Sequence, residues 1–204
     1  MKLLHIDSSI LGIRSVSRAL SAQIVEREKT IHPDLTVVYR DLASDAALHL
    51  SAAHIAAWSG KALEGAALCC DLELGEEYLT ELFEADIVVI GAPMYNFTIP
   101  SQLKVWIDRV VVAGETFKYS ERGESQTLLP TGKKVIIAST RGNVYQTDTP
   151  IAALEHHESY LRSVFSFLGL HDVTVIRAEG LAFGTDVKNA AIRKAQAKIA
   201  ALVA

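Results

Sequence analysis

An apolar run that continues into a methionine, two aromatic residues and an asparagine carries the most informative chemistry of this chain. The run covers residues 87–93, and it is followed by Met94, Tyr95, Asn96 and Phe97. A short β-branched run predicts a buried parallel strand, and Pro93 frees the backbone beyond it because proline cannot donate to the ladder. Ligands of open α/β sheets bind beyond the carboxyl ends of the strands. Unpaired amides beside flat apolar side chains suit a flat heterocycle with a polar edge, such as a flavin ring.

A serine-rich turn follows the first expected strand, between residues 7 and 17. Ser9, Ser15 and Ser17 carry hydroxyls where a helix is expected to begin. Helix N-termini bind phosphate through unpaired N–H groups and the helix dipole, and the hydroxyls add donors. Any one of these serines is more often a cap or a turn former. The cluster as a whole, in this place, favours a phosphate site.

A third polar loop follows the strand expected at residues 133–139. It contains Thr140, Arg141, Gly142 and Asn143. Gly142 allows the backbone to approach a ligand closely, and the Thr140 and Asn143 side chains suit its polar edge. Alone, this loop is weak evidence for a ligand site, because a surface turn also explains it. Because loops after the first, third and fourth strands converge on one crevice, the three loops together predict one ligand site.

Other kinds of site are disfavoured by the residues present. A Gly-x-Gly-x-x-Gly sequence does not follow the first strand, which argues against a Rossmann dinucleotide site, and Gly-x-x-x-x-Gly-Lys-Ser/Thr is absent, which argues against a P-loop NTPase. No metal is expected. His156 and His157 would point about 100° apart on a helix, so these histidines and Glu158 are expected on a solvated or interface surface.

Strands and helices alternate along the chain. Strands are predicted at residues 2–7, 35–40, 86–93, 133–139 and 173–178, and helices at residues 16–30, 72–84, 101–112, 154–168 and 187–203, with Ser15 and Ser101 as N-caps. Residues 43–65 are alanine-rich and helix-permissive, and residues 116–129 predict an inserted hairpin. The pattern predicts a single domain, residues 1–204, of the α/β class. Its sheet would be doubly wound, parallel and five-stranded, flavodoxin-like in the order 2-1-3-4-5, with a small hairpin insertion.

Composition narrows the class of protein. A net charge of -4 over 204 residues offers no basic field for nucleic acid. We expect no signal peptide and no membrane span, because the N-terminus soon becomes polar and no apolar stretch is long enough. Cys69 and Cys70 are adjacent, which ordinary disulfide geometry does not allow without strain. We therefore expect a reducing, cytoplasmic setting and two small buried hydrophobic side chains on a helix.

Taken together, these residues resemble the FMN-dependent NADH-azoreductase family, within the flavodoxin-like quinone reductase group. The resemblance runs nearly end to end. Its most specific piece is Ala92-Pro93-Met94-Tyr95-Asn96-Phe97. Further matching pieces are Ser15-Val16-Ser17, Gly114-Glu115-Thr116-Phe117-Lys118-Tyr119, Thr140-Arg141-Gly142, Phe167-Leu168-Gly169 and Ala178-Glu179-Gly180.

The resemblance implies one FMN per subunit, bound by the three loops. The phosphate would be held by Ser9, Ser15, Val16 and Ser17. The isoalloxazine ring would be lined by Met94, Tyr95, Asn96 and Phe97. The ring site would be completed by Thr140, Arg141, Gly142 and Asn143. The family usually has a glycine where Asn143 stands, and asparagine tolerates left-handed backbone better than most residues.

The resemblance also implies an assembly and a reaction. The family works as a homodimer with its sites at the subunit interface, and the substrate would lie between aromatic walls formed by Phe97, Tyr119 and Phe167. NADH or NADPH would pass a hydride to the flavin, and a quinone or an aromatic azo compound would then take its place, which predicts ping-pong kinetics. Since the flavin carries the chemistry, no catalytic side chain is required, and water or Tyr119 would donate protons.

Three alternatives remain open at this point. The first is a flavodoxin-like electron carrier that binds FMN without oxidising NADH itself. The second is a binding or regulatory module that kept the fold without the cofactor, since fold does not fix function. The third is a quinone reductase with little activity toward azo compounds. Bleaching of bound flavin by NADH separates the enzyme from the first two.

Overall fold

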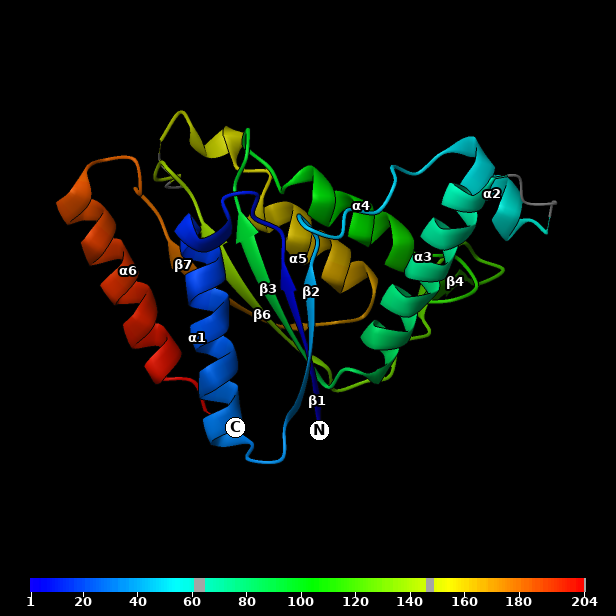
Figure 1. Ribbon diagram of the computed structural model, residues 1–204, viewed down its shortest axis with the longest axis horizontal. Coiled ribbons are helices and arrows are strands. Elements are labelled where there is room, and N and C mark those ends of the chain that lie inside the picture. The colour runs from blue at the N-terminus through cyan, green and yellow to red at the C-terminus, as the bar shows by residue number, and fades with distance from the viewer. Residues whose placement is uncertain (61–64, 146–148, 204) are drawn as a thin grey trace.

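The computed structural model describes residues 1–60, 65–145 and 149–203. Its centre is a parallel sheet of five strands in the order β2-β1-β3-β6-β7 (Figure 1). These strands are β1 (Lys2–Asp7), β2 (Thr36–Asp41), β3 (Ile87–Pro93), β6 (Lys134–Thr140) and β7 (Asp172–Ala178). Numbered within this sheet alone, the order is 2-1-3-4-5, so the predicted flavodoxin-like topology is confirmed.

Helices cover both faces of the sheet (Figure 1). One face carries α1 (Val16–Ile31) and α6 (Thr185–Ala200), and the other carries α3 (Ala66–Glu84), α4 (Ser101–Val110) and α5 (Glu158–Phe167), with the short α2 (Ala52–Trp58) packed beside α3. Successive residues of a strand point to opposite faces. In β3, Val89 therefore joins the core under α1 and α6, and Val88 joins the core under α3 to α5. Because both faces are buried, the run is apolar throughout.

The inserted hairpin is present where it was predicted. Its strands are β4 (Phe117–Tyr119) and β5 (Ser125–Thr127), which pair antiparallel. The Thr127 hydroxyl donates to the Leu168 carbonyl over 2.6 Å. That carbonyl lies at the end of α5, where Gly169 adopts a φ of 77° and ends the helix. The hairpin is thus tied to the C-terminal end of α5.

The helix predicted at residues 154–168 is wrong at its start. A 3-10 turn η2 (Ala152–Leu154) comes first, and α5 begins only at Glu158. The reason is Glu155, whose carboxylate accepts from the backbone N–H groups of His157 at 3.1 Å and Glu158 at 2.7 Å. A carboxylate in this place satisfies the unpaired donors of the first turn and fixes the start of the helix.

Other boundaries moved by a few residues. α3 begins at Ala66 rather than at 72, α6 spans Thr185–Ala200 rather than 187–203, and α4 ends at Val110 rather than at 112. The predicted cap Ser101 is wrong: Pro100 is the N-cap of α4, and Ser101 is its first helical residue, with a hydroxyl that bonds Gln102 instead of a backbone N–H. The Ser15 cap of α1 is confirmed, since its hydroxyl accepts from Arg18 N at 3.3 Å.

Two burial predictions are also wrong. Cys69 is half-buried and Cys70 is exposed on α3, because the helix turns this pair away from the sheet. His157 and Glu158, expected at a surface, are buried because α5 packs their end against the sheet. Among the aromatic residues, Trp106 and Phe165 lie in the core.

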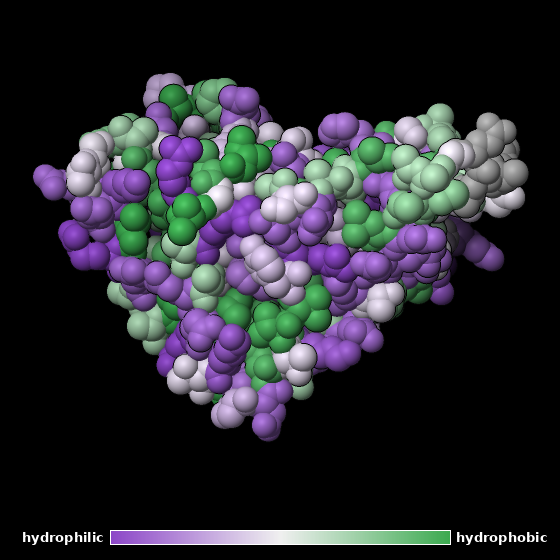
Figure 2. All heavy atoms as spheres, viewed as in Figure 1, coloured by the Kyte–Doolittle hydropathy of each residue, from purple (hydrophilic) through white to green (hydrophobic). Residues whose placement is uncertain are grey.

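The surface on the side of α1 and α6 is mixed. Hydrophobic residues form separate groups among hydrophilic ones in this view (Figure 2), which is ordinary for a solvent-facing surface. Within residues 1–60, 65–145 and 149–203, no helix is both long and apolar enough to cross a membrane.

Candidate functional site

The three predicted loops meet at one edge of the sheet. Asp7 at the end of β1 is in register with Gly91 of β3, and Pro93 at the end of β3 is in register with Thr140 at the end of β6. A cavity of about 210 Å³ opens beyond these strand ends. The predicted residues that line it are Ser9, Ser15, Val16, Met94, Tyr95, Thr140, Arg141 and Gly142. The convergence expected from the sequence is confirmed.

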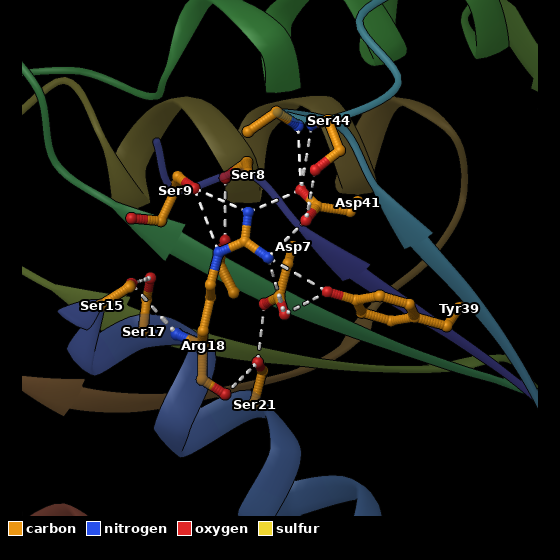
Figure 3. A network of polar contacts seen from close by, with 12 residues as sticks. Asp7, Ser8, Ser9, Ser15, Ser17, Arg18, Ser21, Tyr39, Asp41 and Ser44 are labelled. Atoms are coloured by element: carbon orange, nitrogen blue, oxygen red, sulfur yellow. Dashed lines mark hydrogen bonds and ion pairs between the residues drawn. The ribbon is translucent and has the colours of Figure 1, made fainter. Parts of the chain in front are cut away.

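The serine turn places the N-terminus of α1 at this cavity. Ser15 caps the helix, and its hydroxyl lies 3.0 Å from the hydroxyl of Ser17 (Figure 3). Ser17 is fully buried and does not line the cavity with its side chain. In the described part of the chain, the N–H groups of Val16 and Ser17 donate to no other residue. First-turn amides of this kind bind anions.

The loop after β3 departs from the expectation in one respect. The Met94 amide still donates to Thr140 O at 2.7 Å, so the ladder runs one residue beyond Pro93. Tyr95 and Thr98 then exchange backbone hydrogen bonds of 2.9 and 3.1 Å around a two-residue turn. Among the described residues, the unpaired amides of this loop are those of the turn, Asn96 and Phe97.

The turn itself is strained. Asn96 has a φ of 46° and Phe97 a φ of 73°, the left-handed region that a bulky residue rarely adopts. The segment before α5 stabilises this strained turn through two hydrogen bonds. His156 N donates to Phe97 O over 3.0 Å, and the Thr98 hydroxyl donates to His156 O over 3.0 Å. Backbone strain of this kind persists at ligand sites where surrounding contacts over-determine it.

Tyr95 joins the first and second loops. Its hydroxyl lies 3.1 Å from the Ser9 hydroxyl. On its other side it lines a second and larger hollow of about 630 Å³, shared with Ile10, Asn96, Thr98, Ile99, Ser101, Lys104 and Tyr160. The small cavity and the larger hollow are therefore neighbours, separated by one aromatic side chain.

Arg141 anchors the third loop through its side chain. It is buried, and its Nη2 donates to Glu158 Oε1 over 3.1 Å. Glu158 also accepts from Ser139 Oγ at 2.6 Å and from Arg177 Nε at 2.7 Å. Burial acts to raise the pKa of Glu158, but the hydrogen bonds from Arg177 and Ser139 and the charge of Arg141 lower it to about 2. No sequence pattern indicates that Glu158 is buried as an anion between these three side chains.

His157 lies beside the same anchor. Burial lowers its pKa to about 4, against the opposing charges of Glu158 and Glu155. In the described part of the chain, no three His, Cys, Asp or Glu side chains lie together in a way that could hold a metal ion. His157 and Glu158 are buried at the start of α5, while His156 is exposed.

The predicted aromatic residues divide into two places. Tyr119 and Phe167 both contact Phe117, with ring centroids 5.4 and 4.8 Å apart. Phe97 stands on its own turn at the sheet edge, with 45% of its surface exposed. Asn143 does not line the cavity, and its side chain accepts from the Val144 amide over 2.7 Å. Among the described residues, Phe97 makes no ring contact with Tyr119 or Phe167, and Asn143 lies outside the cavity that Thr140, Arg141 and Gly142 line.

Several lining residues were missed. Leu11 and Leu181 add apolar walls, and Arg14 and Lys188 add charge. Arg14 precedes the Ser15 cap, so the sequence offered a signal for it, whereas Lys188 comes from α6 and offered none. Among the described lining residues the charged ones are Arg14, Arg141 and Lys188, all cationic. Unpaired amides, hydroxyls and cations without a carboxylate fit the doubly charged phosphate of a mononucleotide.

Comparisons with known proteins agree with this geometry. A family model described as a flavodoxin-like fold matches residues 1–203. The FMN-dependent NADH:quinone oxidoreductase of Sinorhizobium medicae is 54% identical over 202 residues, which is 98% of this chain and 96% of that protein. The FMN-dependent NADH:quinone oxidoreductase 2 of Pseudomonas aeruginosa is 53% identical over 201 residues, 98% of this chain and 97% of that protein.

Solved structures give the same result. The FMN-dependent NADH-azoreductase of Bacillus anthracis, solved in complex with FMN, superposes with a TM-score of 0.86 at 28% identity, covering 100% of this chain and 99% of that chain. The chain therefore belongs to the flavodoxin-like family that contains the FMN-dependent NADH:quinone oxidoreductases.

Proposed function

We propose that this protein is an FMN-dependent oxidoreductase that oxidises NADH and reduces quinones and aromatic azo compounds. The observation that carries the proposal is the cavity at the strand ends, with its helix N-terminus, hydroxyls and cations, in a chain 54% identical to an FMN-dependent NADH:quinone oxidoreductase. Bound FMN would supply the redox chemistry, and the protein would supply binding, orientation and electrostatics.

The phosphate would lie against the N-terminus of α1. Ser9 and Ser15 would donate hydroxyl hydrogen bonds, and Val16 and Ser17 their backbone N–H groups. The contribution of Ser17 is placed on its amide because its buried hydroxyl faces Ser15. Charge-assisted hydrogen bonds to phosphate are about twice as strong as neutral ones, so this small cluster supports mononucleotide binding without a P-loop lysine.

The flavin ring would rest on the loop after β3. Met94 and Tyr95 line the cavity, and the amides of Asn96 and Phe97 are available for the polar edge of the ring. The Thr140-to-Gly142 backbone would close the other side, with Arg141 held in place by Glu158. Asn143 is the least supported of the proposed ring contacts, since it does not line this cavity.

We further propose a homodimer with the active site at the subunit interface. Phe97 and Tyr119 expose 45% and 62% of their surfaces, and an open groove of about 470 Å³ between α2, α4 and α5 is lined by apolar side chains that include Leu50, Ile55, Trp58 and Phe167. In such an assembly Tyr119 and Phe167 of one subunit and Phe97 of the other would face one substrate. Sedimentation of the purified protein tests the dimer, and a monomer at micromolar concentration would contradict it. We also propose that the protein is located in the cytoplasm.

The proposal is tested by reconstitution. The protein is mixed with FMN, freed of excess cofactor, and its visible spectrum is recorded before and after anaerobic NADH, followed by a quinone and then an azo dye. Retained flavin that NADH bleaches and a quinone reoxidises is the expected result. Flavin that persists with both NADH and NADPH would instead identify an electron carrier, and failure to retain flavin would favour a binding module. Reoxidation by the quinone alone would identify a quinone reductase with little azo activity.

A matched pair of variants ties the result to the cavity. Ser15→Ala removes the cap and one phosphate donor, so we expect FMN affinity to fall about tenfold. Ser59→Ala removes an exposed hydroxyl that only donates to Ile55 O, and we expect FMN affinity to be unchanged. Equal affinities for the two variants would contradict the placement of the phosphate.

A further inference from the structure

Arg18 lies one turn into α1, directly behind the serine turn (Figure 3). A guanidinium has five N–H donors, and in this structure every one has an acceptor. Nε and Nη2 donate to Ser9 O over 3.1 and 2.7 Å, and Nη1 and Nη2 donate to the two carboxylate oxygens of Asp41 over 2.7 and 2.5 Å. The remaining Nη1 donor reaches the Tyr39 hydroxyl over 3.1 Å. Arg18 therefore has no donor left for a bound anion, although its place in the sequence suggests a phosphate ligand.

The contact that orients the serine turn is the pair of hydrogen bonds from Arg18 Nε and Nη2 to Ser9 O. The described peptide bonds are all trans, so the carbonyl of residue 9 and the N–H of residue 10 point in opposite directions. Fixing the Ser9 carbonyl on Arg18 thus turns the Ile10 N–H away from Arg18, and among the described residues this amide has no partner. The Ser9 hydroxyl is meanwhile held by the Leu11 amide at 3.3 Å and by the Tyr95 hydroxyl at 3.1 Å.

Arg18 is itself fixed from the far side. Asp41 accepts from the Ala43 amide at 3.1 Å and from the Ser44 hydroxyl at 3.0 Å, so the carboxylate that orients Arg18 cannot swing away. The hydrogen bond from Arg18 lowers the pKa of Asp41 to about 2, even though partial burial opposes this. The pair is consequently ionised at any pH at which the protein would work. One chain of contacts runs from the end of β2 through Arg18 to the serine turn.

We infer that Arg18 is a positioning residue for the phosphate of the cofactor: it acts through the Ser9 peptide and does not touch the phosphate. This inference rests on the proposed function, because it assumes that a flavin phosphate binds at the serine turn. It predicts that the shape of the guanidinium, and not only its charge, sets the affinity. Lysine retains the charge but is a single point donor without the planar fork, so it cannot hold Ser9 O and both oxygens of Asp41 together.

The test compares FMN with riboflavin, which lacks the phosphate. Dissociation constants for both flavins are measured by fluorescence quenching on the wild-type protein and on Arg18→Lys and Arg18→Gln. We expect both variants to weaken FMN about tenfold or more, because hydrogen bonds to charged groups are lost from the loop, while riboflavin affinity changes less than about twofold. A loss of general stability would weaken the two flavins alike, so the ratio reports on the phosphate site.

The same helix offers a matched control. Arg27 donates Nε and Nη2 to Leu202 O over 3.1 and 2.7 Å, the same fork on a backbone carbonyl but at the other end of α1. Arg27→Lys should leave both flavin affinities unchanged. Asp41→Asn is a milder second variant that loosens Arg18 without removing it, and it should weaken FMN relative to riboflavin about threefold.

The outcomes separate the two proposals. Wild-type FMN affinity in Arg18→Lys, with a loss only in Arg18→Gln, would show that charge alone matters and would overturn the positioning role. Equal weakening of both flavins, or an unchanged ratio in Asp41→Asn should the Arg18 variants not fold, would also overturn it. If the wild-type protein binds neither flavin, the proposed function falls and the inference falls with it. Wild-type binding of FMN together with an unmoved ratio overturns the inference and leaves the function standing.

Discussion

A Cβ atom at position 91 of β3 would lie 2.2 Å from Asp7 Oδ1 of the neighbouring strand β1. Only glycine leaves room for that carboxylate, which also accepts from the Ser21 hydroxyl over 2.8 Å. The same glycine offers its carbonyl to the Ser8 hydroxyl at 2.8 Å and to the Ser8 amide at 3.2 Å. Gly91 thus leaves room for the side chain of Asp7, the last residue of β1, and accepts the hydrogen bonds of Ser8, which follows Asp7.

Gly91→Ala is therefore expected to be destabilising. The new methyl group has to displace the buried Asp7 carboxylate between the adjacent strands β1 and β3. Overpacking of this kind costs about 1–3 kcal/mol in the free energy of unfolding. Urea denaturation measures the loss. Gly142→Ala is the matched control, because its Cβ would meet only Ala182 Cβ at 3.4 Å and its change should stay within about 0.5 kcal/mol. Equal stability of the two variants would contradict the tight fit at position 91.

Glu158 should make stability depend on acid. Burial acts to raise its pKa, but the hydrogen bonds from Arg177 and Ser139 and the charge of Arg141 lower the value from 4.5 to about 2 in the folded protein. A carboxylate whose folded pKa is lowered contributes stability above its unfolded pKa and loses it as the pH falls through the folded value. Glu158→Gln should therefore be less stable than wild type at pH 7, by about 3 kcal/mol because the buried Arg141 loses the negative charge of the carboxylate to which it is hydrogen-bonded, and the difference should shrink between pH 4.5 and pH 2.

The control for this prediction is an exposed carboxylate. Glu26 pairs with Lys29 on the surface of α1, with 70% of its side chain exposed. Glu26→Gln should change the free energy of unfolding by less than about 0.5 kcal/mol. Denaturation curves at pH 7, 4 and 3 give both comparisons. A constant gap between wild type and Glu158→Gln over this range would show that the anchor does not depend on the ionised carboxylate.

The fold was largely predictable because its signals are local and repeated. The apolar run at residues 87–93 predicts a buried strand and Ser15 predicts the start of a helix, and the structure confirms both. Boundaries failed where a side chain from outside the helix decides them. Glu155 fixes the start of α5 because its carboxylate accepts hydrogen bonds from the amides two and three residues later. The apolar pattern of residues 154–168 does not predict this start.

The site divides in the same way. Ser9 and Met94 lie just after β1 and β3, Thr140 ends β6, and Ser15 caps the helix that follows β1. Their convergence on the cavity therefore follows from the topology alone. The contacts that support these residues do not follow from the topology. Arg18 reaches Asp41 at the end of β2, Arg141 reaches Glu158 at the start of α5, and Lys188 enters the cavity from α6. These contacts join segments that are far apart in the chain. The residues that form them follow no periodic pattern, so the sequence does not predict the contacts.

His157 is expected to weaken the protein in mild acid. Burial lowers its pKa from 6.5 to about 4, so the folded state stays unprotonated where the unfolded state binds a proton. Stability should then fall as the pH is lowered from 6.5 to 4, ahead of the range in which Glu158 acts. His157→Phe removes the titrating group while keeping a flat ring, and its stability should vary less over that interval. The exposed His49 provides the control, because His49→Gln should leave the wild-type slope intact. Identical slopes for wild type and His157→Phe would refute the prediction.

Phe97 offers a test in which stability and function move in opposite directions. Its φ of 73° costs a bulky residue about 1–2 kcal/mol, which glycine avoids, whereas glycine costs about 0.5–1 kcal/mol in chain entropy. Phe97→Gly should therefore raise the free energy of unfolding by up to about 1 kcal/mol. At Phe183, which is 54% exposed and has no positive φ, the same replacement should lower the free energy of unfolding by about 0.5–1 kcal/mol.

The functional half of this test is kinetic. If Phe97 forms a wall of the acceptor site, Phe97→Gly should raise the KM for a quinone about tenfold, because removing a contacting aromatic ring costs about 1–3 kcal/mol. The rate of flavin bleaching by NADH at saturation should change much less, and Phe183→Gly should leave both quantities alone. A stabilised Phe97→Gly with an unchanged KM would mean that the strained ring is held at the sheet edge for some purpose other than contact with the acceptor.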